Sequence, residues 1–281
     1  MSNASGYSKN EMMQSERDWA PSGEIPYAPR HGAKPPVSPP QVDQGQAHFT
    51  EMHSHFVYGL DDGAQTYPQM CGLIDQAWQM GVRTLYATPH CVPGIKFFDR
   101  DLLEKHLQEA RLYCREKGYD MQLFPGAEML WTPQMSYALN QEHLPCLGNT
   151  RFALVEFSPS IEKNDLFMAI ELMIEAGYRP VIAHFERYAC LLKPGTAERL
   201  KRKYAVKLQM NAETLTLPSP LMMRLCIKGW LKKGLVDCIS SDAHHVQDRP
   251  FAIGKAYEVL TQRCGQNYAD FAAKGGIFQE D

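Results

Sequence analysis

The residues from Phe49 to His90 read FTEMHSHFVYGLDDGAQTYPQMCGLIDQAWQMGVRTLYATPH, and they contain a complete pattern of strand, helix and strand. A short β-rich run opens the stretch, and a second one begins at Val82. Between them, apolar residues recur at helical spacing as far as Gly81, a residue that suits the position just after a helix. Two strand-like runs joined by a helix predict a parallel βα unit.

The same pattern continues along the rest of the chain. β-rich runs begin near seven residues: Glu51, Val82, Met121, Phe152, Pro180, Val206 and Val236. Amphipathic helical stretches lie between them, and Gly118, Gly177 and Gly234 follow three of these stretches. Seven strands with intervening helices predict an α/β fold, a seven-stranded (β/α)7 barrel, although an open doubly wound sheet has the same local pattern.

The composition divides the chain into two parts. Residues 1–47 are rich in Pro, Gly and Ser and poor in large apolar side chains, so we expect them to form a disordered or irregular N-terminal arm. Residues 48–281 have the length of a single α/β barrel domain.

Charge and cysteine content exclude several classes of protein. A formal net charge of -3 and a pI near 6.4 provide no basic field for nucleic acid. None of the eight cysteines forms a C-x-x-C pair, and we interpret them as reduced thiols. The start of the chain lacks a signal-peptide pattern, and no run of eighteen apolar residues is present. We therefore expect a cytoplasmic protein that is not an integral membrane protein, and the sequence leaves its oligomeric state open.

Possible metal ligands recur at the carboxyl ends of the predicted strands, the edge at which α/β barrels build their sites. His53 and His55 end the first strand, where alternation points both rings to one side. Further candidates follow other strands: Asp61 and Asp62 in the first loop, then His90, Glu128, Glu156, His184, Asp242 and His244. Only the sixth strand adds none. So many imidazoles and carboxylates at one place would repel one another and resist burial without cations, which predicts a multinuclear metal cluster.

A single histidine after a strand more often forms an ordinary hydrogen bond than a metal bond, so the paired motifs H-x-H and D-x-H are the more specific signals. Four other histidines have no convergent partners in the pattern and are interpreted as ordinary residues: His31, His48, His106 and His143.

Two arginines lie beside the candidate ligands. Arg187 follows His184 by three residues, and Arg249 follows the Asp242 and His244 pair. Arginine binds phosphate oxygens through a planar fork of donors, so cations beside a metal cluster favour phosphoryl chemistry over amide or sugar hydrolysis. Surface ion pairing is the alternative role for each.

Around these residues the chain resembles the PHP (polymerase and histidinol phosphatase) superfamily. Within it, the chain is similar to the bacterial tyrosine-protein phosphatases that are encoded with capsule and exopolysaccharide biosynthesis. The resemblance covers roughly Phe49 to Gly265 and rests on these motifs: His53-Ser54-His55, Gly59-Leu60-Asp61-Asp62-Gly63-Ala64, Ala87-Thr88-Pro89-His90, Gly126-Ala127-Glu128, Ala183-His184-Phe185-Glu186-Arg187-Tyr188, Ser241-Asp242-Ala243-His244 and Arg249-Pro250.

The resemblance implies a distorted seven-stranded barrel that holds two or three ions, usually manganese, and a phosphotyrosine substrate on a bacterial tyrosine kinase. By matching motifs it implies these ligands: His53, His55, Asp62, His90, Glu128, Glu156, His184, Asp242 and His244. It places Arg187 and Arg249 at the phosphate. The mixed nitrogen and oxygen donors also suit Fe or Zn. One departure lies close to the site, because Glu51 stands where the family usually has Asp.

Three other functions remain to be weighed against a tyrosine phosphatase. A PHP-type phosphatase of histidinol phosphate or of a nucleotide would use the same metals. A non-catalytic regulatory module could retain the metals for stability, and turnover of an aryl phosphate would distinguish it from an enzyme. A cysteine-dependent phosphatase is disfavoured, because no cysteine has the C-x5-R spacing that its phosphate cradle needs.

Overall fold

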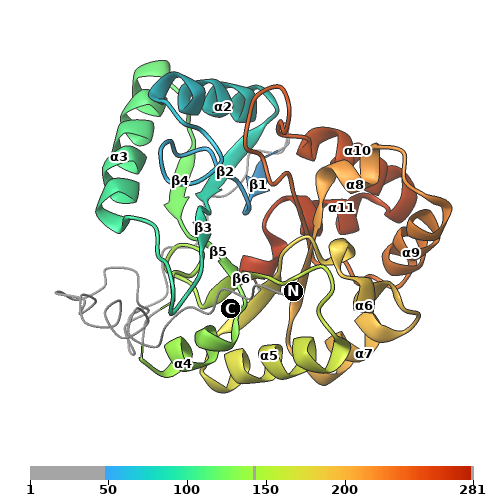
Figure 1. Cartoon of the computed structure of the whole chain (residues 1–281). Coiled ribbons are helices and arrows are strands. Elements are labelled where there is room, and N and C mark those ends of the chain that lie inside the picture. Colours follow the sequence, from blue (N-terminus) through green and yellow to red (C-terminus); the bar gives the residue numbers. More distant parts are fainter. Residues whose placement is uncertain (1–47, 142–143, 280–281) are drawn as a thin grey trace, which may run out of the picture.

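The computed structural model describes residues 48–141 and 144–279, so the predicted N-terminal arm lies outside the described residues. Within them the fold is mixed α/β, with parallel strands curled around a common centre and helices on their outer side (Figure 1). None of the described helices has the length and apolar character needed to cross a membrane.

The strands form two sheets in which every neighbouring pair is parallel. The first sheet has the order β1 (Phe49–Glu51), β2 (Val82–Ala87) and β4 (Gln122–Pro125). The second has the order β3 (His90–Cys91), β5 (Glu128–Leu130), β6 (Phe152–Glu156), β7 (Arg179–Ile182), β8 (Lys207–Asn211) and β9 (Cys238–Ser240).

Each of the seven predicted β-rich runs begins within a few residues of a strand. Two further short strands, β3 and β5, follow β2 and β4 after two-residue interruptions at residues 88–89 and 126–127. Pro89 has no backbone N–H for a sheet, which accounts for the first interruption. The described residues therefore contain nine strands in two sheets, and closure into one seven-stranded barrel stays a prediction.

The first and last strands lie side by side beyond their carboxyl ends. The backbone N–H of His55 donates to the carbonyl of Ala243 at 2.8 Å, and the N–H of Asp242 donates to the carbonyl of His53 at 3.0 Å. These bonds bring the two ligand-rich segments of the sequence, one near each end of the described chain, into direct contact.

Helices connect the strands, and their ends follow local sequence signals. Asp99 accepts a hydrogen bond from Leu102 N at the start of α3, and the helix ends at Gly118, whose φ of 69° is left-handed. The helices are α2 (Tyr67–Gln79), α3 (Arg100–Lys117), α4 (Pro133–Gln141), α5 (Lys163–Glu175), α6 (Ala189–Leu192), α7 (Thr196–Lys203), α8 (Ala212–Thr216), α9 (Leu221–Lys232), α10 (Ile253–Cys264) and α11 (Gln266–Ala273), with the 3-10 turns η1 (Phe185–Arg187) and η2 (Gly276–Gln279).

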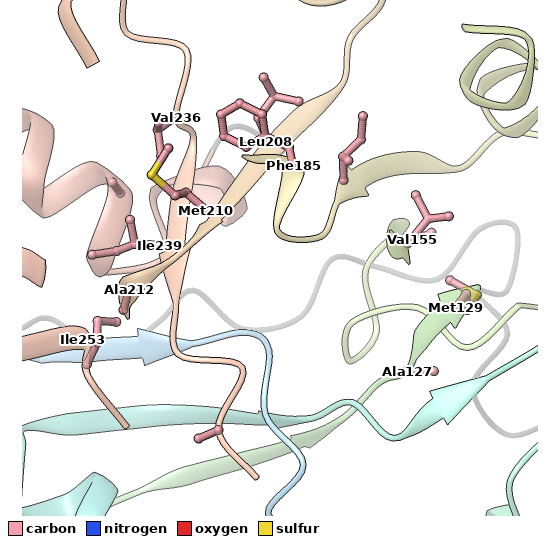
Figure 2. Close-up of a cluster of buried hydrophobic side chains, with 14 of the residues drawn as sticks. Ala127, Met129, Val155, Phe185, Leu208, Met210, Ala212, Val236, Ile239 and Ile253 are labelled. Carbon is pink, nitrogen blue, oxygen red and sulfur yellow. The ribbon is translucent and has the colours of Figure 1, made fainter. Parts of the chain in front are cut away.

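Alternation along the strands divides the apolar core in two. On β6, Ala153 and Val155 belong to the large cluster that also contains helix residues, part of which appears in Figure 2. Phe152 and Leu154 belong to a smaller cluster formed mainly by the opposite faces of the strands, together with Ile277 from η2. Because alternation continues, the next inward position on β6 is Glu156, so polar side chains lie above this inner apolar cluster.

Candidate metal centre

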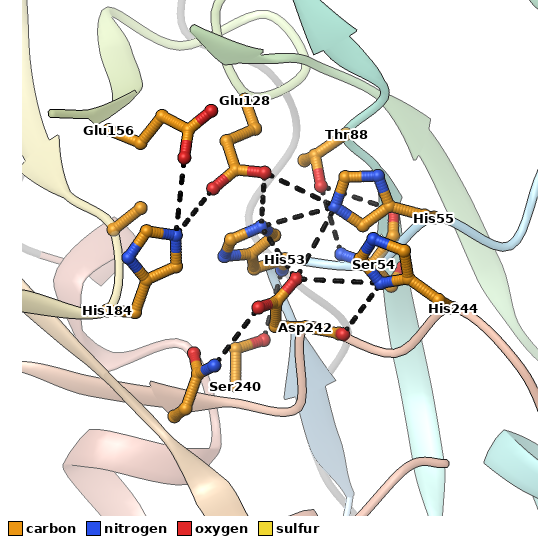
Figure 3. A network of polar contacts seen from close by, with 12 residues as sticks. His53, Ser54, His55, Thr88, Glu128, Glu156, His184, Ser240, Asp242 and His244 are labelled. Carbon is orange, nitrogen blue, oxygen red and sulfur yellow. Dashed lines mark hydrogen bonds and ion pairs between the residues drawn. The ribbon is translucent and has the colours of Figure 1, made fainter. Parts of the chain in front are cut away.

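The candidate ligands lie in the strands or in the loops that follow them. Figure 3 labels all of them except Asp62 and His90, and the labelled side chains point toward one another. His53 and His55 follow β1, and Asp242 and His244 follow β9. The remaining candidates lie at the loop after β1 (Asp62), in β3 (His90), at the start of β5 (Glu128), at the end of β6 (Glu156) and after β7 (His184).

Two of these residues have an unusual backbone. His184 has a φ of 30° and Asp242 a φ of 54°, and these are the two non-glycine residues with positive φ in the described part of the chain. Ala183 packs in the inner cluster, so strict alternation would turn the next side chain away from the centre. The left-handed backbone at His184 turns the ring back, and such strained conformations concentrate at functional sites.

Four buried residues form the middle of the site. His53, His55, Glu128 and Asp242 each offer a ligand atom within 4.8 Å of the others. His53 Nε2 lies 3.1 Å from Glu128 Oε2 and 3.3 Å from Asp242 Oδ1, while His55 Nε2 lies 3.4 Å from the same Glu128 oxygen.

Two further groups flank this middle and share residues with it. His55, Asp62, His90 and His244 form the first, in which Asp62 Oδ1 lies 3.3 Å from both His90 Nε2 and His244 Nε2. His90, Glu128 and Glu156 form the second, with His90 Nδ1 at 3.1 Å from Glu128 Oε2 and at 3.6 Å from Glu156 Oε1.

His184 stands beside these groups, with Nε2 at 2.7 Å from Glu128 Oε1 and at 3.7 Å from Glu156 Oε2. Glu156, which the sequence motifs place least firmly, thus lies within reach of two imidazoles. The structure therefore brings all nine predicted ligands to one place.

The outward hydrogen bonds of three histidines decide which ring nitrogen carries the proton. In each case Nδ1 faces an oxygen that can only accept: Gln209 Oε1 for His53 at 3.2 Å, Asp61 Oδ2 for His55 at 2.6 Å, and the carbonyl oxygen of Asp242 for His244 at 2.9 Å. A neutral ring that donates from Nδ1 has its lone pair on Nε2. When these rings are neutral, all three Nε2 lone pairs consequently face the centre of the site.

Three buried polar atoms of the site have no hydrogen-bond partner among the described residues, and this bears on whether the site fits cations. They are Glu128 Oε2, Asp242 Oδ1 and His244 Nε2. His53 Nε2 lies within ion-pair distance of the first two, but while the ring is neutral its lone pair faces the lone pairs of these oxygens and cannot hydrogen-bond to them. Leaving such groups unpaired costs about 1–3 kcal/mol each, more when charged. Divalent cations would satisfy them, so the donor set fits a metal cluster.

The electrostatics of the site favour positive charge. Burial acts to lower the pKa of His55, yet the nearby carboxylates of Asp242 and Asp61 raise it well above its usual range. Burial acts to raise the pKa of Glu128, but the charge of His53 and a hydrogen bond with His184 hold it well below its usual range. The carboxylates are therefore ionised, and in the cation-free chain a second proton on His55 supplies positive charge that a cation would otherwise supply.

Both predicted arginines lie at the rim of the site. Arg187 Nη2 is 3.1 Å and Arg249 Nη2 2.9 Å from Asp242 Oδ2, the carboxylate oxygen that faces away from His53. Their side chains are 46% and 39% exposed, so both guanidinium groups reach solvent beside the candidate ligands.

Sequence reasoning assigned no orienting role to three polar residues that hold the ligands in place. Asp61 accepts from His55 Nδ1 and from the backbone N–H groups of Gly63 and His90. The sixth strand, which was expected to add no ligand, instead supplies Gln209 and Asn211 to the hydrogen-bond network. The sequence pattern did single out Asp61, beside Asp62, as a possible ligand, whereas amides within a strand carry no signal for a metal site.

Comparison with known proteins extends these observations. The sequence model of the family described as capsular polysaccharide synthesis, CpsB/CapC, matches residues 49–273. Tyrosine-protein phosphatase CpsB from Streptococcus agalactiae is 27% identical over 78% of this chain and 93% of its own length. Tyrosine-protein phosphatase YwqE from Bacillus subtilis (strain 168) is 26% identical over 76% of this chain and 85% of its own length.

A solved structure shows the same fold. It comes from work on YwqE from Bacillus subtilis and CpsB from Streptococcus pneumoniae, described as metal-dependent tyrosine phosphatases. The match has a TM-score of 0.69 and 22% sequence identity, and it covers 78% of this chain and 89% of the other. The resemblance that the sequence motifs indicated is thereby confirmed. This chain belongs to the CpsB/CapC family of capsular polysaccharide synthesis.

Proposed function

We propose that this chain is a manganese-dependent phosphatase that hydrolyses phosphotyrosine on a protein, and that its substrate is a cytoplasmic bacterial tyrosine kinase that controls capsule or exopolysaccharide synthesis. The observation that carries the proposal is the convergence of three candidate ligand groups beside two exposed arginines. The names of the relatives, tyrosine-protein phosphatases, support the substrate class.

The nine candidate ligands His53, His55, Asp62, His90, Glu128, Glu156, His184, Asp242 and His244 would hold the cations. Bound divalent cations at such a site neutralise charge on phosphoryl oxygens and lower the pKa of nearby water. Arg187 and Arg249 would bind the phosphate. Each guanidinium has five N–H donors, and its hydrogen bond to Asp242 uses the Nη2 group, so the planar fork can also face an anion at the rim.

The cysteines do not support a thiol nucleophile. Burial raises the pKa of Cys114 to about 11 and that of Cys146 to about 12, whereas a reactive cysteine needs a lowered pKa.

The leaving group of the phosphate ester also bears on the substrate class. Tyrosine has a pKa near ~10, so its phenolate leaves more readily than the alkoxide of serine or histidinol, which favours aryl phosphates as substrates.

Metal removal coupled to a substrate panel tests the proposal. The purified chain is treated with a chelator, reloaded separately with Mn, Fe or Zn, and assayed on phosphotyrosine peptides, p-nitrophenyl phosphate, phosphoserine peptides and histidinol phosphate. We expect activity to disappear with the chelator, to return best with Mn, and to be highest on the two aryl phosphates. A strong preference for histidinol phosphate would contradict the tyrosine-phosphatase proposal, and activity that survives complete metal removal would contradict the metal-dependent one.

A further inference from the structure

Strand β8 presents two amide side chains to the site. Leu208 and Met210 belong to the large apolar cluster (Figure 2), so alternation turns Gln209 and Asn211 to the opposite face. Gln209 is completely buried and Asn211 is 6% exposed. Buried amides must satisfy both their oxygen and their nitrogen, so their partners decide their orientation.

Gln209 has only one possible orientation. Its Oε1 accepts from the backbone N–H of His184 at 2.7 Å and from His53 Nδ1 at 3.2 Å. A backbone N–H can only donate, so the oxygen of Gln209 must face it. The amide nitrogen Nε2 then donates to Asn211 Oδ1 at 2.9 Å.

The orientation of the Gln209 amide in turn fixes the orientation of the Asn211 amide. Because its Oδ1 accepts from Gln209, its Nδ2 must donate, and the acceptor is Asp242 Oδ2 at 3.0 Å. The same carboxylate oxygen accepts from Arg187 and Arg249. The backbone N–H of Asn211 donates to the buried Glu186 at 2.9 Å, which fixes the strand end that carries the amide.

We propose that Gln209 and Asn211 are positioning residues that form a one-way chain of amide hydrogen bonds, which we call the amide relay. The relay aligns His53, His184 and Asp242, three candidate ligands from three different strands, and through Asp242 it aligns the two arginines. It also keeps the proton of His53 on Nδ1 and so keeps the Nε2 lone pair directed at the cations. This inference rests on the proposed metal-dependent function and names what organises that site.

The test compares metal affinity in matched variants of the full chain. Gln209→Leu keeps the approximate size of the side chain but removes the acceptor for His53 and His184. Gln76→Leu is the control, because it also removes an amide with two hydrogen bonds: Gln76 donates to Val246 O and accepts from Phe251 N. Neither of these partners is a candidate ligand. Affinity for Mn²⁺ and Zn²⁺ is measured by competition with a chromophoric chelator, and folding is followed by thermal unfolding.

We expect Gln209→Leu to bind each metal about 10- to 100-fold more weakly than the wild type, the usual effect of losing a partner that orients a ligand. Gln76→Leu should lower the unfolding temperature and leave metal affinity within about twofold. A purely structural role for Gln209 would instead lower the unfolding temperature alone. A folded Gln209→Leu protein with wild-type metal affinity would therefore overturn the relay.

Asn211→Ala covers the case in which Gln209→Leu does not fold. It removes the donor to Asp242 and leaves His53 and His184 bonded to Gln209, so we expect metal affinity to fall at least about fivefold, as for loss of a hydrogen bond to a charged group. Unchanged affinity would count against the relay. A wild-type chain that binds metal but does not hydrolyse phosphotyrosine would refute the proposed substrate alone, and a wild-type chain that binds no divalent cation would overturn both proposals.

Discussion

At the scale of single residues, the histidines of the site are oriented by oxygens that lie outside it. Asp61 is the clearest case, because one carboxylate holds the ring of His55 and the backbone N–H groups of Gly63 and His90. These three bonds outweigh the effect of burial and lower the pKa of Asp61 to about 2. Asp61 is therefore ionised at neutral pH and can only accept hydrogen bonds.

The arginines should act on phosphate and not on the metals. We expect Arg187→Ala and Arg249→Ala each to lower kcat/KM for a phosphotyrosine peptide by roughly 30- to 1,000-fold, which corresponds to about 2–4 kcal/mol of lost transition-state stabilisation. Metal content, measured by elemental analysis, should not change. Arg202→Ala, at an exposed position of α7, is the control and should keep full activity. Loss of bound metal in either rim variant would contradict the assigned role.

Protons should compete with the cations. Burial acts to lower the pKa of His90, but the nearby carboxylates of Glu128 and Glu156 raise it to about 10 in the cation-free chain, and the pKa of His55 is also raised. Both rings are thus protonated at neutral pH, and a cation must displace those protons. Affinity for Mn²⁺ should therefore rise with pH between about 6.5 and 8.5. Calorimetric titration in buffers with different ionisation heats measures the protons released, and a pH-independent affinity would contradict this expectation.

At the scale of elements, the loops after the strands carry the site, and the strands fix where the loops start. The apolar runs and the glycines after the helices were sufficient to predict the strand positions. The H-x-H and D-x-H pairs were sufficient to predict the convergence. The interruptions after β2 and β4 were not predicted, since they depend on two residues each. The left-handed backbone at His184 was not predictable either, because sequence signals positive φ reliably only at glycine.

The relay shows a second limit of sequence reasoning. Gln209 and Asn211 look like ordinary polar positions of a half-buried strand. Their orientation is set by the backbone N–H of His184, which lies just after the neighbouring strand β7 and 25 positions earlier in the chain. Partners so remote in sequence become visible only when the strands are assembled.

The loop after β1 should tolerate no side chain at Gly63. A Cβ there would overlap the carbonyl oxygen and Cβ of His55, which no flexible side chain can relieve. We expect Gly63→Ala to displace Asp61 and Asp62 and to weaken Mn²⁺ binding at least tenfold. Gly229→Ala in α9 meets nothing within 4 Å and should raise the unfolding temperature, because alanine favours helix by about 1 kcal/mol. Wild-type metal affinity in the Gly63 variant would show that the loop adapts.

At the scale of the whole molecule, an apolar inner cluster supports a polar site that cannot stabilise itself. The unpaired atoms of Glu128, Asp242 and His244 oppose folding until cations bind. The site therefore lowers the free energy of unfolding of the cation-free chain, and bound metals would raise it again.

Metal should accordingly raise the unfolding temperature. A cation present at about 100 times its dissociation constant stabilises the folded state by about 2.7 kcal/mol. For a domain of this size that corresponds to a rise of roughly 5–10 °C. Differential scanning calorimetry of the metal-free and Mn-loaded chain measures it, with Na⁺ at equal ionic strength as the control. An unchanged unfolding temperature would mean that the cluster contributes nothing to the fold.

The pairing of the chain beyond β1 with the chain beyond β9 also determines when the site can form. The N–H of His53 bonds to Ser240 Oγ across 187 positions of sequence, so the contact has a very high contact order and a large loop-closure entropy. A ribosome synthesises His53 and His55 early but supplies Asp242 and His244 only after nearly all of the remaining strands and helices. A nascent chain that stops before β9 therefore lacks the last ligands, and cation capture becomes one of the final events of biosynthesis.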